Sequence, residues 1–235
     1  MLHVLNPIPS ESIRLIVFDL DGTLIDSQKD LANSINAMLI QLHQQPLPEE
    51  IIATYIGDGA GMLVRRALGD PDDQRLVEHG LNLFLAYYRE HKLDHTYVYP
   101  GVFDSLESLR TTPDGSQRQF AVLTNKPINP SRAICDALGL SPHFFQIYGG
   151  NSFPTKKPDP EGLNRLIAEA GVAPHETLMI GDSDVDILTA RRAEAWVIGC
   201  KFGLSPHTLE NISADCLVDS ASEWATALRL AGIAK

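Results

Sequence analysis

Short apolar stretches recur along the chain, and each of them ends abruptly in polar residues. These stretches are rich in β-branched and aromatic side chains and nearly free of charge, which is typical of buried strands. The strand candidates are residues 13–18, 120–123, 144–148 and 177–180. Apolar positions at helical spacing follow at residues 133–138, 163–170 and 187–193. Strands that alternate with helices predict βαβ units, and therefore an α/β fold built on a parallel sheet.

Residues 27–98 have a different pattern, with helical periodicity and no convincing strand. The helical candidates in this region are residues 31–42, 62–68 and 76–88. We predict a small all-α cap domain at residues 27–98, inserted after the first strand. Residues 1–26 and 99–235 then form one discontinuous α/β core domain. The flanking residues 26–27 and 98–101 are expected to be two hinge strands.

Polar residues whose side chains could take part in catalysis or ligand binding follow the predicted strands. Asp19 and Asp21 come directly after the first strand, and extended geometry would point both carboxylates the same way. Like charges that close repel unless a cation lies between them or one carboxyl is protonated. Further candidates after the other strands are Thr124, Asn125, Lys157, Asp182, Ser183 and Asp186. Ligands bind outside the carboxyl ends of strands in open α/β sheets, so we expect these residues to converge at one edge.

Composition and charge limit the classes of function. The chain has 235 residues, 44% of them hydrophobic and 21% charged, which suits one sizeable domain and a smaller one. The net charge of −11 argues against a nucleic-acid partner, and it leaves an anionic ligand to be held by local cations. No apolar run approaches the roughly 20 residues that span a bilayer, so we expect no membrane partner.

A cytoplasmic location is expected from the cysteines and from the start of the chain. Cys135, Cys200 and Cys216 are odd in number and widely spaced, which favours buried thiols in a reducing compartment. Residues 1–12 contain no lysine or arginine, unlike a signal peptide. The sequence is compatible with either a monomer or a homodimer.

Four ordered motifs carry a resemblance to a known family. They are the run from Asp19 to Leu24, the pair Thr124 and Asn125, Lys157 before Pro158, and the run from Gly181 to Asp186. They resemble the motifs of the haloacid dehalogenase superfamily of phosphatases, which have a Rossmann-like core. Residues 56–60, 66–68, 99–102 and 124–127 are similar to the phosphoglycolate phosphatase group, whose small helical cap the predicted insert resembles.

The resemblance implies a role for each motif. Asp19 is the expected nucleophile and Asp21 the general acid and base. Mg²⁺ is the expected cofactor, with the side chains of Asp19 and Asp182 and the backbone carbonyl of Asp21 as ligands. The expected phosphate-binding residues are Thr124, Asn125 and Lys157, while Asp186 and Ser183 support the site without ligating the ion. A cap loop with Gly57, Asp58, Gly59 and Arg66 is expected to help choose the substrate.

Several of these residues also have plain structural interpretations. Asp186 could serve only the dipole of the helix that starts near it, and Thr124 could be an ordinary strand residue. Arg65 and Arg66 could pair with a substrate carboxylate, although arginines on short helices are more often solvated. Lys156, beside Lys157, is interpreted as a solvated surface charge.

The predicted function is Mg²⁺-dependent hydrolysis of a small phosphorylated metabolite, with 2-phosphoglycolate as the best single candidate. Related activities stay open, namely a phosphosugar phosphatase, a mutase similar to β-phosphoglucomutase and a pyrophosphatase. A dehalogenase is disfavoured because Asp21 supplies the acid and base that phosphoryl transfer needs. Outside enzymes, the alternatives are a non-catalytic phosphate or metal sensor and a receiver-like signalling domain.

Overall fold

A seven-stranded sheet forms the centre of the protein, in the order β1-β9-β8-β7-β2-β5-β6. The computed structural model describes residues 3–230. The strands are β1 His3–Val4, β2 Leu15–Phe18, β5 Gln119–Leu123, β6 Gln146–Tyr148, β7 Thr177–Gly181, β8 Trp196–Cys200 and β9 Cys216–Val218. Only the edge pair β1 and β9 is antiparallel within this sheet. The predicted α/β class with a parallel sheet is confirmed.

Strand β2 lies in the middle of the sheet, between β5 and β7. Phe18 at its end is in register with Val122 of β5 and Ile180 of β7. The chain leaves all three strands at the same edge, so the polar residues that follow them are brought together. This register places Asp19 between the Thr124 loop and the Asp182 loop.

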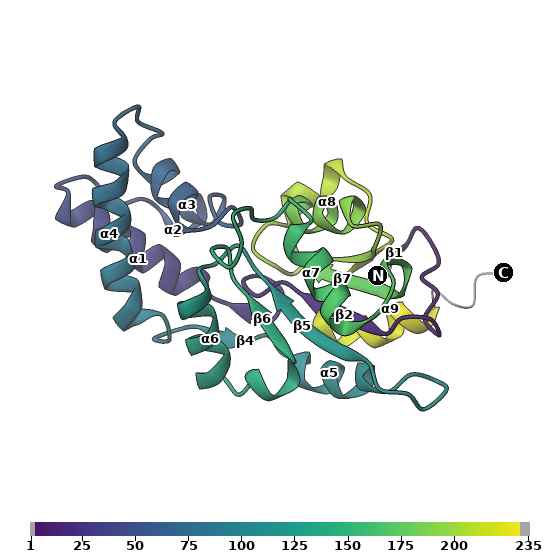
Figure 1. Ribbon diagram of the computed structural model, residues 1–235. Helices are drawn as coiled ribbons and strands as arrows, with labels where there is room; N and C mark the ends of the chain where they lie inside the picture. The colour runs from purple at the N-terminus through teal and green to yellow at the C-terminus, as the bar shows by residue number, and fades with distance from the viewer. Residues whose placement is uncertain (1–2, 231–235) are drawn as a thin grey trace.

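Helices cover both faces of the sheet (Figure 1). They are α5 Val102–Arg110, α6 Ile128–Ala137, α7 Glu161–Ala170, α8 Asp184–Arg192 and α9 Trp224–Leu230. Side chains of β2 alternate between two apolar clusters: Ile16 and Phe18 pack with α5, α6 and α9, whereas Leu15 and Val17 pack with α7 and α8. This alternation explains why the strand is apolar at every position.

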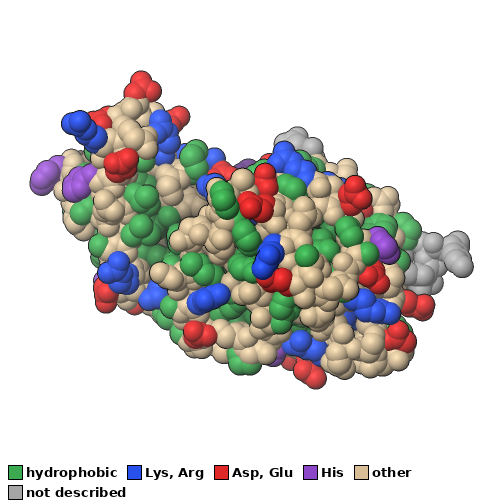
Figure 2. Space-filling model, viewed as in Figure 1, with side chains coloured by type: hydrophobic (Ala, Val, Ile, Leu, Met, Phe, Trp, Pro, Cys, Tyr) green, Lys and Arg blue, Asp and Glu red, His purple; other side chains and the backbone are tan. Residues whose placement is uncertain are grey.

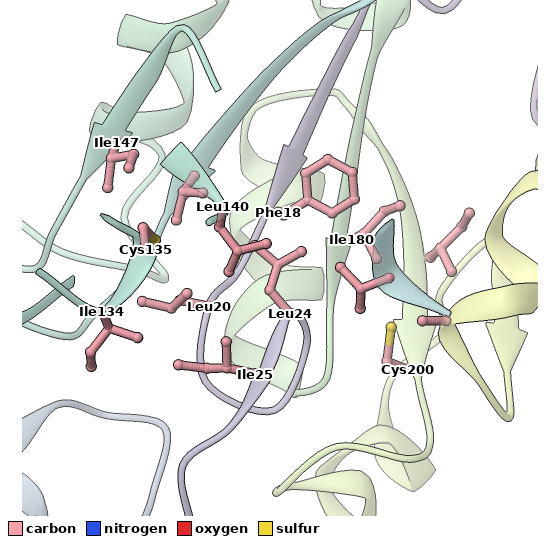
Figure 3. Packing of buried hydrophobic residues seen from close by; sticks show 14 of the residues in the cluster. Phe18, Leu20, Leu24, Ile25, Ile134, Cys135, Leu140, Ile147, Ile180 and Cys200 are labelled. Carbon is pink, nitrogen blue, oxygen red and sulfur yellow. The ribbon is translucent and has the colours of Figure 1, made fainter. Parts of the chain in front are cut away.

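The first of these clusters continues into the segment that follows β2. Leu20, Leu24 and Ile25 point into the same apolar interior as Ile134 and Cys135 of α6 (Figure 3). Buried apolar side chains therefore anchor the turn that carries Asp19 and Asp21, which fixes the position of the two carboxylates.

A helical insert lies to one side of the sheet, on the left in Figure 1. It contains α1 Gln28–Gln41, α2 Glu49–Ala53, α3 Ala60–Ala67 and α4 Gln74–His91. The two connections pair as short antiparallel strands, β3 Ile25–Asp26 and β4 Tyr97–Val98. These strands begin one residue earlier than the sequence suggested. The buried Asp30 carboxylate accepts hydrogen bonds from the backbone N–H groups of His95 and Thr96, which ties the second connection to α1.

The helical candidates of the insert correspond to α1, α3 and α4, whereas α2 was not predicted because it is a single short turn. In the core, β8 and β9 were also missed, and the strand expected at residues 144–148 begins only at Gln146. Phe144 lies before the strand and packs its ring against Phe18, while Phe145 is exposed. Two consecutive aromatic residues can therefore be mistaken for the start of a strand, even when one ring packs in the core and the other is exposed to solvent.

Charged side chains of both signs are interspersed over the face drawn in Figure 2. Within the part of the chain that the structure describes, no helix is long and apolar enough to cross a bilayer.

Candidate active site

A buried lysine joins two carboxylates at the carboxyl edge of the sheet. Lys157 Nζ lies 2.9 Å from Asp19 Oδ1 and 2.6 Å from Asp186 Oδ1. Lys157 comes from the loop after β6, Asp19 follows β2, and Asp186 lies in the first turn of α8. Burial raises the pKa of Asp19 to about 6; the Lys157 ammonium opposes that rise and the Asp186 carboxylate adds to it. Lys157 therefore holds the Asp19 carboxylate in place and favours its ionised form.

Three carboxylates form a tight cluster around this point. Asp19, Asp182 and Asp186 each offer one oxygen, and these oxygens lie within 4.8 Å of one another. Burial raises the pKa of Asp182 well above its usual range, and the charges of Asp186 and Asp19 raise it further. Such a cluster of buried acids is costly unless a cation is shared among them.

The carboxylate oxygens of the cluster differ in how many hydrogen bonds they accept. Asp19 Oδ1 is buried and accepts no hydrogen bond of good geometry from residues 3–230, despite its ion pair with Lys157. Asp182 Oδ2 accepts from the backbone N–H groups of Leu204 and Ser205, at 2.8 and 3.1 Å, whereas Oδ1 has only a 3.5 Å contact with the Thr23 hydroxyl. Asp182 Oδ1 therefore remains available to a hard cation such as Mg²⁺, whereas Asp19 Oδ1 already faces the Lys157 ammonium.

Both carboxylate oxygens of Asp186 accept hydrogen bonds from other residues of the protein. Its Oδ1 accepts from Lys157 Nζ, and its Oδ2 accepts from the hydroxyl and the backbone N–H of Ser183, at 2.7 and 3.2 Å. Ser183 and Asp186 together form a capping box at the start of α8. Asp186 thus contributes to the start of α8 and also holds the Lys157 ammonium.

Two glycines allow the backbone to approach Asp182. A Cβ on Gly22 would lie 2.2 Å from the Asp182 carboxylate, and a Cβ on Gly203 would lie 2.3 Å from Asp182 Cβ. Gly22 also has a φ of +83°, which other residues rarely adopt. Glycine at both positions therefore lets the backbone pack directly against Asp182 without a clash.

The Asp21 carboxylate has its own set of partners. Its Oδ1 accepts a hydrogen bond from the Ser27 hydroxyl at 2.5 Å, and Lys126 Nζ donates to both of its oxygens, at 2.9 and 3.1 Å. Strand β2 ends at Phe18, so both acids lie beyond the strand itself. Both acids nevertheless line one cavity.

Thr124 and Asn125 lie beside the acids, at the end of β5. The Thr124 hydroxyl accepts from the backbone N–H of Lys126 at 3.2 Å, which holds the loop in a tight turn. Asn125 Nδ2 donates to the backbone carbonyl of Lys157 at 3.0 Å and to that of Gly57 at 3.3 Å. Asn125 thus links the lysine loop of the core to the helical insert.

The loop between α2 and α3 approaches the core closely. A Cβ on Gly59, whose φ is +86°, would lie 2.9 Å from the backbone carbonyl oxygen of Asn125. Lys156 Nζ donates to the Asp58 carbonyl at 2.5 Å, and the Ser205 hydroxyl donates to the Ile56 carbonyl at 3.2 Å. Lys156 is exposed, as interpreted from the sequence, but it also contacts the insert.

Arg66 holds this loop together. Its guanidinium pairs with the Asp58 carboxylate at 2.5 Å and donates to the Tyr55 carbonyl at 3.0 Å. Arg65 pairs with Asp70, which lies just beyond the C-terminal end of α3. Neither arginine lines the cavity, so a structural role accounts for both.

A cavity of about 50 Å³ lies between the insert and the core. Its core side carries Asp19, Asp21, Thr124, Asn125 and Lys126. Its insert side is largely apolar, with Leu31, Leu63, Phe84 and Tyr88 among the lining residues, together with the backbone of Gly57 and Gly59. Of the residues expected at the strand ends, Asp19, Asp21, Thr124 and Asn125 line this small, partly open cavity, and the others do not.

Sequence reasoning missed two contributors to this site. Lys126 was considered only as part of a motif. Its position directly after Thr124 and Asn125 could have identified it as a residue of the site. The backbone of Leu204 and Ser205, which binds Asp182, gave no signal, because any residue type carries a backbone N–H.

Comparison with known proteins agrees with this geometry. A family model described as haloacid dehalogenase-like hydrolase matches residues 16–200, and the chain belongs to that family. It is 40% identical over 215 residues to the phosphoglycolate phosphatase of Chromobacterium violaceum, covering 90% of this chain and 94% of that protein. The phosphoglycolate phosphatase of Neisseria meningitidis is 38% identical over 203 residues, covering 85% of each chain.

A solved structure has the same architecture. The crystal structure of a predicted phosphoglycolate phosphatase from Haemophilus somnus aligns with a TM-score of 0.82 at 32% identity, covering 90% of this chain and 96% of that one. Together with the site, these relatives identify the chain as a phosphatase, a hydrolase of phosphoric monoesters.

Proposed function

We propose that this phosphatase hydrolyses 2-phosphoglycolate, or a closely similar small phosphate monoester, through a phosphorylated Asp19. The observation that carries the proposal is the buried Asp19 carboxylate, ion-paired to Lys157 and open to a cavity that also contains Asp21. The names of the relatives supply the candidate substrate.

Asp19 attacks the phosphorus atom with a carboxylate oxygen. An aspartyl-phosphate bond forms while the bond from phosphorus to the ester oxygen breaks, which divides a very slow hydrolysis into two easier steps. Lys157 neutralises charge on both the attacking carboxylate and the transferring phosphoryl group.

Asp21 moves protons in both steps. It gives a proton to the departing alkoxide, and it then takes a proton from the water that attacks the aspartyl phosphate. Inorganic phosphate leaves, and both carboxyl groups return to their starting states. Ser27 and Lys126 hold the Asp21 carboxylate in position for these transfers.

Phosphate recognition is assigned to the loop after β5. The Thr124 hydroxyl and the backbone N–H of Asn125 donate to phosphoryl oxygens, and Lys157 adds a point charge. The placement of Thr124 and Asn125 on the cavity wall supports this assignment.

The donor set fits Mg²⁺. Asp19 and Asp182 side chains, with the Asp21 backbone carbonyl, are the proposed ligands, because the two carboxylates belong to one tight cluster and Asp182 Oδ1 has only a long contact with Thr23. When bound, Mg²⁺ neutralises the acidic cluster and the phosphoryl oxygens. Asp186 and Ser183 orient Lys157 and the start of α8 without ligating the ion.

The insert, residues 27–98, is proposed to act as a cap domain over the core of residues 1–26 and 99–235. Its apolar wall excludes water from the reacting groups, and the loop with Gly57, Asp58 and Gly59 closes against Asn125. Arg66 contributes by holding Asp58 in that loop.

A cytoplasmic location is part of the proposal. Cys135, Cys200 and Cys216 are buried free thiols, which suits a reducing compartment. The partner is a small phosphorylated metabolite, without a nucleic acid or a membrane, and the enzyme acts as a monomer or homodimer.

Phosphate release with Mg²⁺ tests the proposal, using 2-phosphoglycolate, sugar phosphates, pyrophosphate and an aryl phosphate. We expect 2-phosphoglycolate to have the highest kcat/KM and Asp19→Asn to abolish release from every ester. Asp184→Asn is the matched control, because Asp184 is a neighbouring acid outside the cluster. Wild-type rates in Asp19→Asn would rule out the nucleophile, and a preference for a sugar phosphate or pyrophosphate would reassign the substrate.

A further inference from the structure

One cationic side chain lines the cavity among the residues that the structure describes, and it is Lys126. The other candidates are committed elsewhere, since Arg65 pairs with Asp70, and Arg66 pairs with Asp58 outside the cavity. Lys157 pairs with Asp19 and Asp186. A substrate with a second negative charge beyond its phosphate therefore meets Lys126, which is itself paired with Asp21 but is the cation that faces the cavity among the described residues.

Lys126 is held at a defined place in the cavity. It is 6% exposed, its Nζ contacts both Asp21 oxygens, and it lies 4.7 Å from the centre of the Tyr88 ring. An ammonium group has three N–H donors, and Asp21 accounts for at most two of them. Lys126 therefore keeps donor capacity beyond its contacts with Asp21.

Tyr88 supplies a second donor from the insert. Its ring stacks on Phe84 at 5.6 Å, which fixes its orientation on α4. The hydroxyl oxygen is buried near the Lys126 ammonium, and it makes no hydrogen bond of good geometry within residues 3–230. Burial raises the pKa of Tyr88 to about 12, so the hydroxyl keeps its proton. A buried hydroxyl without a hydrogen bond of good geometry costs stability, and such groups in native proteins call for an explanation.

We propose that Lys126 and Tyr88 together bind the carboxylate of the substrate. The proposal rests on the proposed function, in which Asp21 contacts the leaving oxygen. Lys126 Nζ lies 2.9 Å from Asp21 Oδ1, so a carboxylate one carbon away from the leaving oxygen is within its reach. The lysine charge and the tyrosine O–H match the two oxygens of a carboxylate.

The surrounding wall narrows the substrate class. Leu31, Leu63 and Phe84 offer no hydrogen bonds to the several hydroxyls of a sugar, and burying those hydroxyls unpaired is unfavourable. The cavity therefore selects a short 2-phosphorylated carboxylic acid over a phosphosugar.

The test compares 2-phosphoglycolate with 2-phosphoglycolamide, in which a neutral carboxamide replaces the carboxylate. We expect wild-type enzyme to favour the acid, and Lys126→Met to lower the ratio of the two kcat/KM values by roughly 10- to 100-fold. The control is Lys92→Met, a lysine on the neighbouring groove that does not line the cavity and should leave the ratio unchanged.

Lys126→Met also disturbs Asp21, so a second variant is needed. Tyr88→Phe keeps the ring and removes only the hydroxyl, and it therefore tests carboxylate binding without removing the lysine. We expect the same ratio to fall by about 10-fold with Tm unchanged or raised, because the hydroxyl makes no hydrogen bond of good geometry that the substitution would remove. Equal losses on both esters in Lys126→Met, together with an unchanged ratio in Tyr88→Phe, overturn carboxylate binding and leave only a role in holding Asp21. A wild-type enzyme without preference for the acid also overturns it. A wild-type enzyme inactive on every ester contradicts the proposed function instead.

Discussion

Lys157 Nζ lies 2.6 Å from Asp186 Oδ1, and both side chains are almost completely excluded from solvent. Removing one partner of a buried ion pair leaves an uncompensated charge, which is far more costly than losing an exposed pair. We expect Lys157→Met to lower the free energy of unfolding by about 3–5 kcal/mol in urea titrations. Lys156→Met is the matched control, since this exposed neighbour should cost about 1 kcal/mol or less. Similar losses in the two variants would contradict the importance of the buried pair.

Asp21→Asn should separate the two chemical steps. An aryl phosphate has a good leaving group, so Asp19 should still be phosphorylated and aryl alcohol released in the first turnover. Turnover should then fall by roughly 10²- to 10⁴-fold, because the amide cannot take a proton from water. Rapid-mixing kinetics measure the burst and the steady state separately. A variant without a burst but with normal steady-state turnover would exclude this assignment.

Removal of divalent cations should destabilise the protein and stop turnover. Asp19, Asp182 and Asp186 repel one another without a cation. A bound ion stabilises the fold by about 2.7 kcal/mol at a concentration a hundred times its Kd. Thermal unfolding and phosphate release, with EDTA and after Mg²⁺ is restored, measure both effects. Full activity in metal-free buffer would contradict the ligand assignment.

The metal-free protein should lose stability as the pH rises from about 4 to above 6. The pKa of Asp19 is raised from 3.8 to about 6, so in this interval the folded state holds a proton that the unfolded state has released. Stability is therefore highest below this range and declines through it. Urea unfolding in EDTA at several pH values measures the slope, and Asp19→Asn should flatten it. A slope unaffected by that substitution would assign the effect to another group.

Gly59→Ala should weaken substrate use by holding the loop away from the core. The new Cβ would meet the Asn125 carbonyl oxygen at 2.9 Å, and φ at this position is +86°. We expect kcat/KM to fall by at least about 10-fold, as small displacements at a reacting centre cost heavily. Gly61→Ala is the control, because it has open space and lies within α3, where alanine stabilises by about 1 kcal/mol. Equal activity in the two variants would contradict a role for the loop.

Glu194→Gly should stabilise the protein without changing its chemistry. Glu194 is exposed just after α8 with a φ of +57°, a left-handed conformation that glycine adopts without strain. We expect a gain of about 1 kcal/mol in the free energy of unfolding, measured in urea, with kcat/KM unchanged. A loss of stability would indicate that the glutamate side chain contributes a contact of its own.

Much of the fold follows from patterns that are local in the sequence. The apolar runs before Asp19, Thr124 and Asp182 predicted β2, β5 and β7, because a strand buried on both faces must be apolar at every position. The helical spacing of residues 27–98 predicted the insert for a similar reason. Strand β8 was missed although it is equally buried, and its place became clear only through pairing with β7.

The sequence by itself determined which strand ends carry acids, hydroxyls and lysine, and that a parallel sheet brings them to one edge. Tertiary structure alone decided their partners. Lys126 reaches Asp21 across 105 positions, and Ser205 reaches the insert at Ile56 across 149. Arg66, a candidate for the substrate, instead pairs with Asp58. Such contacts depend on how separate elements pack and on where each side chain finds its partner, and no local spacing of residues records that geometry.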